Sequence, residues 1–279
     1  MKDKLKKRFV FSSLDRTLPL FIESIGYNPF EENFTRKRGY PYFHWLQSVE
    51  GEGKILFSGQ EVPLQPGNGV LLTPFTPHSY YPLQPQWTTM YLTFGGTASK
   101  QILTSLEINK SALYTESTEG LLYLVMKEMI DNIEGNRDCS SLDLSKDLYN
   151  FILVLKKYGK INNQPSLSQY YEKINPVVNW IEKKFAENIG LPDMAEEGNV
   201  SPQYLNTLFQ ETFGISPYSF LIQIRIRESK RVLISNKDAS LKEVAKAVGF
   251  NDVSHFVATF RKKEGMTPKK YRSLHINYY

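Results

Sequence analysis

The feature that most constrains this chain is an internal repeat in its last hundred residues. Leu191 and Ala195 recur fifty residues later as Leu241 and Ala245. The spacing then becomes fifty-one for the pairs Gly198 and Gly249, Leu205 and Phe256, Phe209 and Phe260, Gly214 and Gly265, and Pro217 and Pro268. Each copy reads as a short helix, a turn at the first glycine and a second helix. The repeat therefore predicts two helix-turn-helix motifs.

Local signals at the helix ends agree with this prediction. Ser201 is an N-cap candidate followed by Pro202 at the first helical position, and Asp252 holds the capping position of the second copy. Gly214 and Gly265 are suited to helix ends. Residues 218–235 between the copies predict a long connecting helix. If that connector is rigid, the two reading helices would enter adjacent major grooves about 34 Å apart.

The second helix of each copy should carry the DNA contacts, because that helix enters the major groove. Its outer face is polar in the first copy, with short side chains that donate and accept hydrogen bonds. The second copy is poorer in donors, and Val257 or Ala258 would contact thymine methyl groups. The predicted DNA-binding residues are Ser201, Gln203, Tyr204, Asn206, Thr207, Gln210, Ser254, His255, Val257, Arg261 and Lys262.

Positive charge is concentrated in the same region. The net charge of the whole chain is +5, but from Leu221 onward thirteen Lys and Arg residues face five Asp and Glu residues, a local excess of +8. Such an excess is typical of a surface that binds a polyanion, although a solvated basic helix face gives the same count.

These motifs resemble the AraC-type transcriptional regulators over residues 172–273. The resemblance is carried by Ser201 to Phe209, Phe213-Gly214-Ile215-Ser216-Pro217, Arg225-Ile226, Glu243-Val244-Ala245, Val248-Gly249-Phe250, Ser254-His255-Phe256, Phe260-Arg261-Lys262 and Gly265 to Arg272. It implies an all-α domain that binds double-stranded DNA in two adjacent major grooves, with Gln203, Asn206 and Thr207 on the first reading helix. Thr207 and Ala258 replace basic residues that many members carry, so arginine-to-guanine readout is not expected there.

The first hundred residues predict a different fold. From Phe34 to Phe94 apolar and polar residues alternate, and glycine-rich turns separate short segments such as 54–57, 70–73 and 87–94, which predicts a small β-barrel or sandwich. Gly51-Glu52-Gly53, Pro66-Gly67-Asn68-Gly69 and Pro74-Phe75-Thr76-Pro77-His78 resemble the cupin-like sensor domains that accompany AraC-type modules. The resemblance implies a barrel around a small-molecule effector, often a sugar.

The candidate ligand-binding residues follow from that resemblance and from nearby histidines. They are His44, Glu50, His78, Tyr80, Thr89 and Tyr91. Polar groups among aromatic walls suit a carbohydrate, whose hydroxyls need hydrogen bonds and whose ring faces stack. The alternative is that Tyr91 belongs to the core and Glu50 to an exposed turn.

Two amphipathic helices, 121–133 and 142–158, are predicted after the barrel, and they would either cap it or form a dimer interface. The expected division is a barrel at 1–98, a helical dimerisation or capping segment at 99–160, a linker at 161–171 and the DNA-binding domain at 172–279. The fold class is thus an all-β cupin-like barrel with two accessory helices, followed by an all-α domain with two helix-turn-helix motifs.

Enzymatic function and a membrane location are not expected. Only His44 and His78 offer metal ligands in the β-rich half, where a cupin metal site needs three or four, and no nucleophile motif is present. The single cysteine, Cys139, excludes an intramolecular disulfide and favours a reducing cytoplasm. No apolar run is long enough to span a membrane, and no signal peptide, metal or cofactor is predicted.

The sequence therefore predicts a cytoplasmic, homodimeric transcription activator that responds to a small molecule, with a sugar as the favoured effector and RNA polymerase as an expected partner. Two alternatives stay open at this point. One is a constitutive regulator whose barrel serves only dimerisation, and the other is a metal-dependent cupin enzyme fused to a DNA-binding module.

Overall fold

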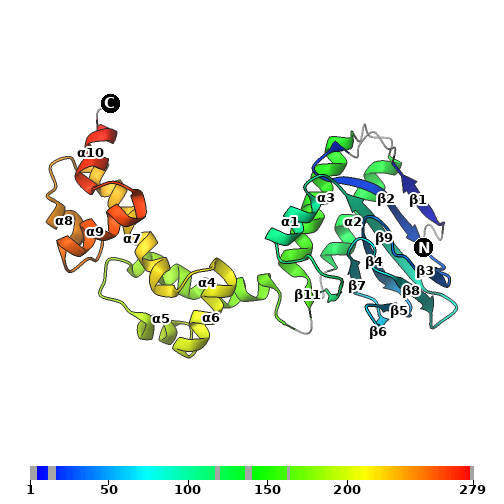
Figure 1. Cartoon of the computed structure of the whole chain (residues 1–279). Helices are drawn as coiled ribbons and strands as arrows, with labels where there is room; N and C mark the ends of the chain where they lie inside the picture. Colours follow the sequence, from blue (N-terminus) through cyan, green and yellow to red (C-terminus); the bar gives the residue numbers. More distant parts are fainter. Residues whose placement is uncertain (1–4, 12–16, 117–119, 136–139, 162–163, 277–279) are drawn as a thin grey trace. The chain divides into compact units, whose positions relative to one another are not determined.

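The computed structural model describes residues 5–11, 17–116, 120–135, 140–161 and 164–276. The chain divides into two compact units, Met1–Ser168 and Gln169–Tyr279 (Figure 1). Cys139 and residues 12–16 lie outside the described part. Within that part, no helix combines the length and the apolar character that a membrane span requires.

The first unit contains two antiparallel sheets that pack face to face. The larger sheet has seven strands, in the order β1 (Lys7–Val10), β2 (Phe21–Asn28), β9 (Thr88–Gly95), β4 (Phe43–Glu50), β7 (Asn68–Leu72), β10 (Ala112–Thr115) and β11 (Lys160–Ile161). The smaller sheet has the order β3 (Phe34–Arg36), β8 (His78–Pro82), β5 (Gly53–Phe57) and β6 (Gln60–Leu64). The β-rich first half is thus as predicted.

Strict alternation along the central strands separates two interiors. In β9, Met90 and Leu92 pack on one side into a core shared with helices. Tyr91, between them, packs instead into the core shared by the two sheets. Because successive side chains of a strand point to opposite faces, each central strand belongs to both interiors.

Among the residues described in this unit, three helices accompany the larger sheet: α1 (Ser99–Ser105), α2 (Leu121–Glu134) and α3 (Ser141–Tyr158). The two predicted helices are confirmed, and they cap the sheet with side chains such as Met126 and Phe151, which are fully buried. A capping box formed by Ser140 and Asp143 fixes the start of α3. β10, which pairs with β7, was not predicted.

The second unit is entirely helical within the described residues. It contains α4 (Leu167–Lys184), α5 (Leu191–Glu197), α6 (Pro202–Phe213), α7 (Pro217–Ser235), α8 (Leu241–Ala247), α9 (Val253–Glu264) and α10 (Pro268–Ile276). The predicted helix-turn-helix pairs are α5 with α6 and α8 with α9, and α7 is the predicted connector. α4 begins at Leu167, inside the segment expected to be a linker.

The predicted helix caps are present in the structure. Ser201 Oγ accepts a hydrogen bond from the Tyr204 amide at 3.2 Å, and Asp252 Oδ1 accepts one from the His255 amide at 2.6 Å. Gly214 and Gly265 end α6 and α9 with φ of +68° and +72°, a left-handed conformation that favours glycine.

Each helix-turn-helix motif has its own hydrophobic core, and α7 contributes to both. Leu221 and Ile224 pack with α4, α5 and α6, whereas Ile226 and Leu233 pack with α8 and α9. The apolar residues of the connector are therefore divided between two cores.

Candidate DNA interface and effector site

The first reading helix, α6, exposes the polar face that its spacing predicted. Gln203, Thr207 and Gln210 are exposed, and Asn206 is half-buried. The opposite side is anchored by Leu205, Leu208 and Phe209, all fully buried in the first core. Burial of that stripe fixes the rotation of α6 about its axis, so the polar face is held toward solvent.

Four of the predicted DNA-binding residues also make local contacts. Asn206 Nδ2 donates to the Pro202 carbonyl at 3.2 Å, and Thr207 Oγ1 donates to the Gln203 carbonyl at 3.3 Å. The Tyr204 hydroxyl accepts a hydrogen bond from Lys173 Nζ of α4 at 3.1 Å, while Ser201 caps the helix. The local hydrogen bond of Asn206 uses its Nδ2, so its amide oxygen remains available, as does the exposed side-chain amide of Gln203.

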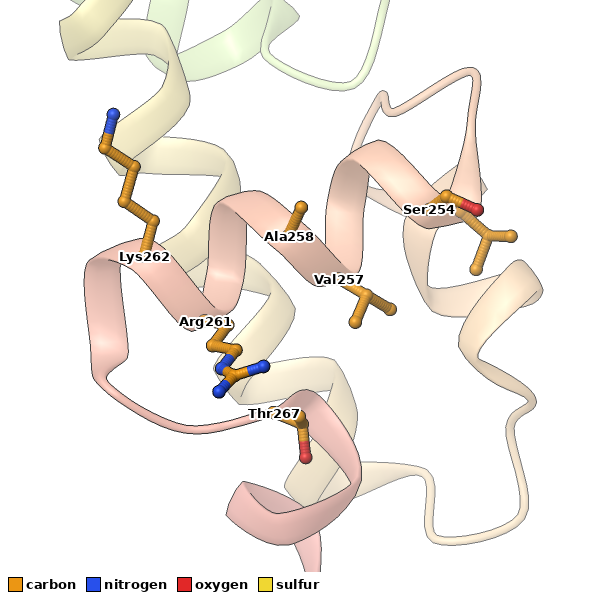
Figure 2. A pocket seen from close by; sticks show the side chains of 7 residues that line it. Ser254, Val257, Ala258, Arg261, Lys262 and Thr267 are labelled. Carbon is orange, nitrogen blue, oxygen red and sulfur yellow. The ribbon is translucent and has the colours of Figure 1, made fainter.

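The second reading helix, α9, presents a mixed surface. Its side chains line an open groove of about 740 Å³. Figure 2 shows Arg261 pointing toward the segment that carries Thr267. The lining residues are Val253, Ser254, Val257, Ala258, Arg261, Lys262 and Thr267. Two of the middle positions of this surface, Val257 and Ala258, are apolar. His255 is exposed, and its ring makes an edge contact with Phe250 at 5.5 Å between centroids.

The count of basic residues overstated the positive surface of this unit. Arg225 is only 6% exposed and donates to backbone carbonyls, and Arg272 donates to the carbonyls of Lys237 and Ala239. Arg227, Lys230 and Arg231 form ion pairs with glutamates. The basic residues of α8, α9 and α10 that remain exposed are Lys242, Lys246, Arg261, Lys262, Lys263, Lys269 and Lys270.

In the first unit, two buried histidines lie between the sheets. The rings of His44 on β4 and His78 on β8 are 6.1 Å apart, and His44 Nδ1 lies 2.8 Å from Thr93 Oγ1. Burial, together with the nearby His78 and Arg36, lowers the pKa of His44 to about 3, and burial also lowers the pKa of His78. Both histidines are therefore neutral at pH 7.

The neutral His78 carries an unused hydrogen-bond acceptor. Its Nδ1 lies 2.8 Å from the carbonyl of Thr76, and because a carbonyl only accepts, Nδ1 must carry the proton. Nε2 is then a lone-pair acceptor. It is buried and has no hydrogen-bond partner among the described residues.

Aromatic rings and two charged side chains complete this cluster. Tyr80 is 8% exposed and stacks on Phe34 at 5.2 Å, and Tyr91 lies 6.0 Å from the ring of His44. Thr89 Oγ1 donates to Glu31 Oε2 at 2.6 Å. The Arg36 guanidinium stacks 4.0 Å from the centroid of the Tyr40 ring, and its buried Nη1 has no partner within the described chain.

The structure brings together five of the six predicted ligand-binding residues and adds two that sequence reasoning missed. His44, His78, Tyr80, Thr89 and Tyr91 contribute to one interior, whereas Glu50 is exposed at the end of β4 and acts electrostatically on Tyr27, on the helix-covered side. The missed residues are Glu31 and Arg36. Arg36 is half-buried and lies in the polar run 35–38, which gives no signal that its guanidinium reaches the interior.

Comparison with known families decides the class of the protein. A family model described as an AraC-like ligand binding domain matches residues 24–152, and one described as a helix-turn-helix domain matches residues 194–273. The chain belongs to the AraC family. This AraC-family protein is a transcriptional regulator with a ligand-binding domain and a DNA-binding helix-turn-helix domain, as the sequence predicted.

Curated relatives cover most of this AraC-family chain. The Msm operon regulatory protein of Streptococcus mutans is 24% identical over 80% of this chain and 81% of its own length. The lactose operon transcription activator of Staphylococcus xylosus is 25% identical over 84% of this chain and 86% of its own length. Among solved structures, the DNA-binding domain of AdpA in complex with a target DNA is 26% identical over 37% of this chain and 92% of that one, with a TM-score of 0.36.

The part of the chain that the structure describes contains no group of three or more His, Cys, Asp or Glu residues that is arranged to hold a metal ion. His44 and His78 instead share a site with Arg36 and with aromatic rings. The family and the relatives are DNA-binding transcriptional regulators.

Proposed function

We propose that this protein is a transcription activator whose DNA binding responds to a carbohydrate held between the two sheets of the first unit. The observation that carries the proposal is the buried cluster around His78 and Arg36, where a lone-pair acceptor and an N–H donor have no partner in the described chain. Buried polar groups are nearly always hydrogen-bonded, so unpaired ones point to a ligand.

The chemistry of the cluster suits a neutral polyol. A sugar hydroxyl both donates and accepts, so it can donate to His78 Nε2 and accept from Arg36 Nη1, while the Glu31 carboxylate accepts further hydroxyl protons. Tyr80 stacks on Phe34 and Tyr91 on His44, so a pyranose ring would pack against the edge or the second face of these rings. The name of the lactose operon transcription activator, among the relatives, agrees with this class of effector.

A thermal-shift screen of the full chain against mono- and disaccharides tests the effector. A sugar at a hundred times its dissociation constant adds about 2.7 kcal/mol to the stability of the state that binds it. We expect at least one sugar to raise the unfolding temperature, and Arg36→Met to abolish that shift.

Tyr81→Phe is the matched control, because the Tyr81 hydroxyl donates to Glu61 on the exposed side of the smaller sheet. It should keep the shift. If no sugar shifts the unfolding temperature, or if Arg36→Met and Tyr81→Phe respond alike, the carbohydrate site is wrong. The alternative of a constitutive regulator, whose barrel serves only dimerisation, would then be favoured. If the protein instead converted a substrate in a metal-dependent reaction, the alternative of a cupin enzyme fused to a DNA-binding module would be favoured.

For the DNA side, we infer that α6 and α9 read the two parts of one operator in adjacent major grooves. The residues proposed to contact DNA are those predicted from the sequence, with Gln203 and Asn206 on bases and Lys262 on the phosphate backbone. Val257 and Ala258 favour a second part that contains thymine, whose methyl group accepts apolar contact.

Operator selection from a random duplex library, followed by binding measurements, tests these assignments. Gln203→Ala or Asn206→Ala should cost about 1–3 kcal/mol on the first part of the operator only, whereas Lys262→Ala should weaken specific and random duplexes alike. Gln223→Ala, an exposed position on α7, is the control and should change neither. Equal losses on specific and random DNA for all variants would refute the base contacts.

The outer faces of α2 and α3 support a proposal for self-association. Leu124, Leu142, Tyr149 and Leu153 are exposed there, opposite the residues that cap the sheet. We place the dimer interface on this surface. The proposal assigns no catalytic residue or cofactor, and it includes RNA polymerase as the partner of an activator. Sedimentation of the full chain and of a Leu124→Glu, Leu153→Glu double variant tests the interface, and an unchanged mass for the variant would rule it out.

A further inference from the structure

The loop that joins α4 to α5 contacts both helix-turn-helix motifs of the second unit. Phe185, at the start of this loop, packs against the core of the first motif and also against the core of the second. Phe185 therefore connects the two cores directly, in addition to the covalent connection through α7.

Arg225 holds this loop from the middle of α7. Its side chain is 6% exposed, Nε donates to the Phe185 carbonyl at 2.7 Å, and a terminal nitrogen donates to the Glu187 carbonyl at 2.8 Å. Its guanidinium lies 5.8 Å from the centroid of the Phe250 ring, in the turn of the second motif. One buried arginine thus contacts the loop before the first motif and the turn of the second.

Gly249 brings the same turn against the same loop. It has φ of +85°, and a Cβ atom at this position would lie 2.7 Å from the Phe185 carbonyl oxygen and 3.0 Å from Ala186. The two backbones therefore approach too closely for any side chain. We use the name clamp for Phe185, Arg225, Gly249 and Phe250 together.

The clamp restricts the orientation of the second reading helix relative to the first. α7 alone connects the motifs through one helix of 19 residues, and long helices are rarely straight. The clamp adds a second connection on one side of α7 and so resists rotation of the second motif about that helix. The buried guanidinium makes this connection specific, because without Arg225 the Phe185 carbonyl would lose its donor and the Glu187 carbonyl would keep only the Ile189 amide.

We propose that Arg225 is a positioning residue that sets the spacing and rotational phase of the two operator parts that one chain reads. The inference rests on the proposed DNA-binding function of α6 and α9 and is independent of the effector. Arg225 is buried, so it makes no contact with DNA itself. Each motif keeps its own core, so the loss of the clamp leaves both reading helices folded.

The test uses the full-length protein and operators of altered spacing. A two-part site is first selected from a random duplex library, and duplexes are then made with one or two base pairs added or removed between the parts. Each base pair shifts the second part by about 3.4 Å and about a tenth of a turn. For the wild-type protein we expect an affinity loss of about tenfold or more per base pair.

Arg225→Met keeps the apolar stem and removes both hydrogen bonds. We expect the affinity of this variant to fall by less than about threefold for each base pair of altered spacing. Its affinity for each isolated operator part should equal that of the wild type. Arg227→Met is the matched control: Arg227 lies two residues further along α7, is exposed and pairs with Glu182 and Glu228. It should keep the steep profile.

Two further variants protect the test against misfolding of Arg225→Met. Arg225→Lys keeps a buried donor and should give an intermediate profile, and Gly249→Ala should flatten the profile by pushing the turn from the loop. If the Arg225 and Gly249 variants lose affinity equally at every spacing, the positioning role is refuted, although DNA binding stands. If the wild type selects no two-part site, the proposed DNA function itself fails.

Discussion

The buried histidine pair predicts that the first unit loses stability in mild acid. His44 is 7% exposed, and its pKa is lowered to about 3, against 6.5 for an unperturbed histidine. His44 is therefore protonated below about pH 6.5 in the unfolded chain, but only below about pH 3 in the folded chain. Stability is fully present above pH 6.5 and declines as the pH falls toward 3.

The size of the effect follows from the difference between the two pKa values. Each pH unit below 6.5 costs about 1.4 kcal/mol for one excluded proton, so His44 accounts for about 3 kcal/mol by pH 4.5. The groups that face it are His78, Arg36, Tyr91 and Thr93, and none of them is an acid that would stabilise the imidazolium.

Urea unfolding of the full chain between pH 7.5 and 4.5 measures this effect. Trp45 and Trp87 are fully buried in the first unit and report its unfolding by fluorescence. Carboxylates titrate in the same range, so the informative quantity is the difference between wild type and His44→Gln. We expect that difference to shift by about 3 kcal/mol between pH 7.5 and 4.5 in favour of the variant. His255→Gln, at an exposed position, should follow the wild type. Parallel pH profiles for wild type and His44→Gln would refute the reasoning.

Two further substitutions test other parts of the structure. Asp252→Ala removes the N-cap of α9 and should cost about 1 kcal/mol of stability, with weaker DNA binding at the second part of the operator only, as measured by thermal unfolding and duplex titration. Gly26→Ala places a Cβ atom 2.5 Å from the Tyr91 ring and 2.6 Å from the Lys7 carbonyl, so it should displace Tyr91 and abolish the sugar-induced thermal shift, and an unchanged shift would exclude Tyr91 from the site.

The helical half could be predicted closely because its signals are local. Ser201 followed by Pro202, and Asp252 three residues before the amide that it caps, mark helix starts within a few residues of sequence. The alternation of Thr89, Tyr91 and Thr93 with apolar residues identified β9 in the same way. Such patterns depend on the period of one element and need no knowledge of its neighbours.

The remaining parts depend on contacts between distant segments. Thr89 and Glu31 are 58 residues apart, and Arg225 is 40 residues from the carbonyl of Phe185. Arg225 and Arg227 are the same residue type two positions apart, so the sequence alone does not show that Arg225 is buried and Arg227 is exposed. β10 is too short to be recognised without its partner β7. Charge counting therefore assigned to the surface an arginine that belongs to the interior.

The division of β9 between two interiors constrains how the sequence can change. A deletion of one residue before Thr89 would shift the strand by one position, exchange the two faces and place Met90 and Leu92 beside His44. The polar residues would then lie under α2 and α3. A point substitution on one face of β9 leaves the side chains of the other face in place, so the ligand preference of this domain can change by single substitutions. The number of residues in β9 cannot change in the same way.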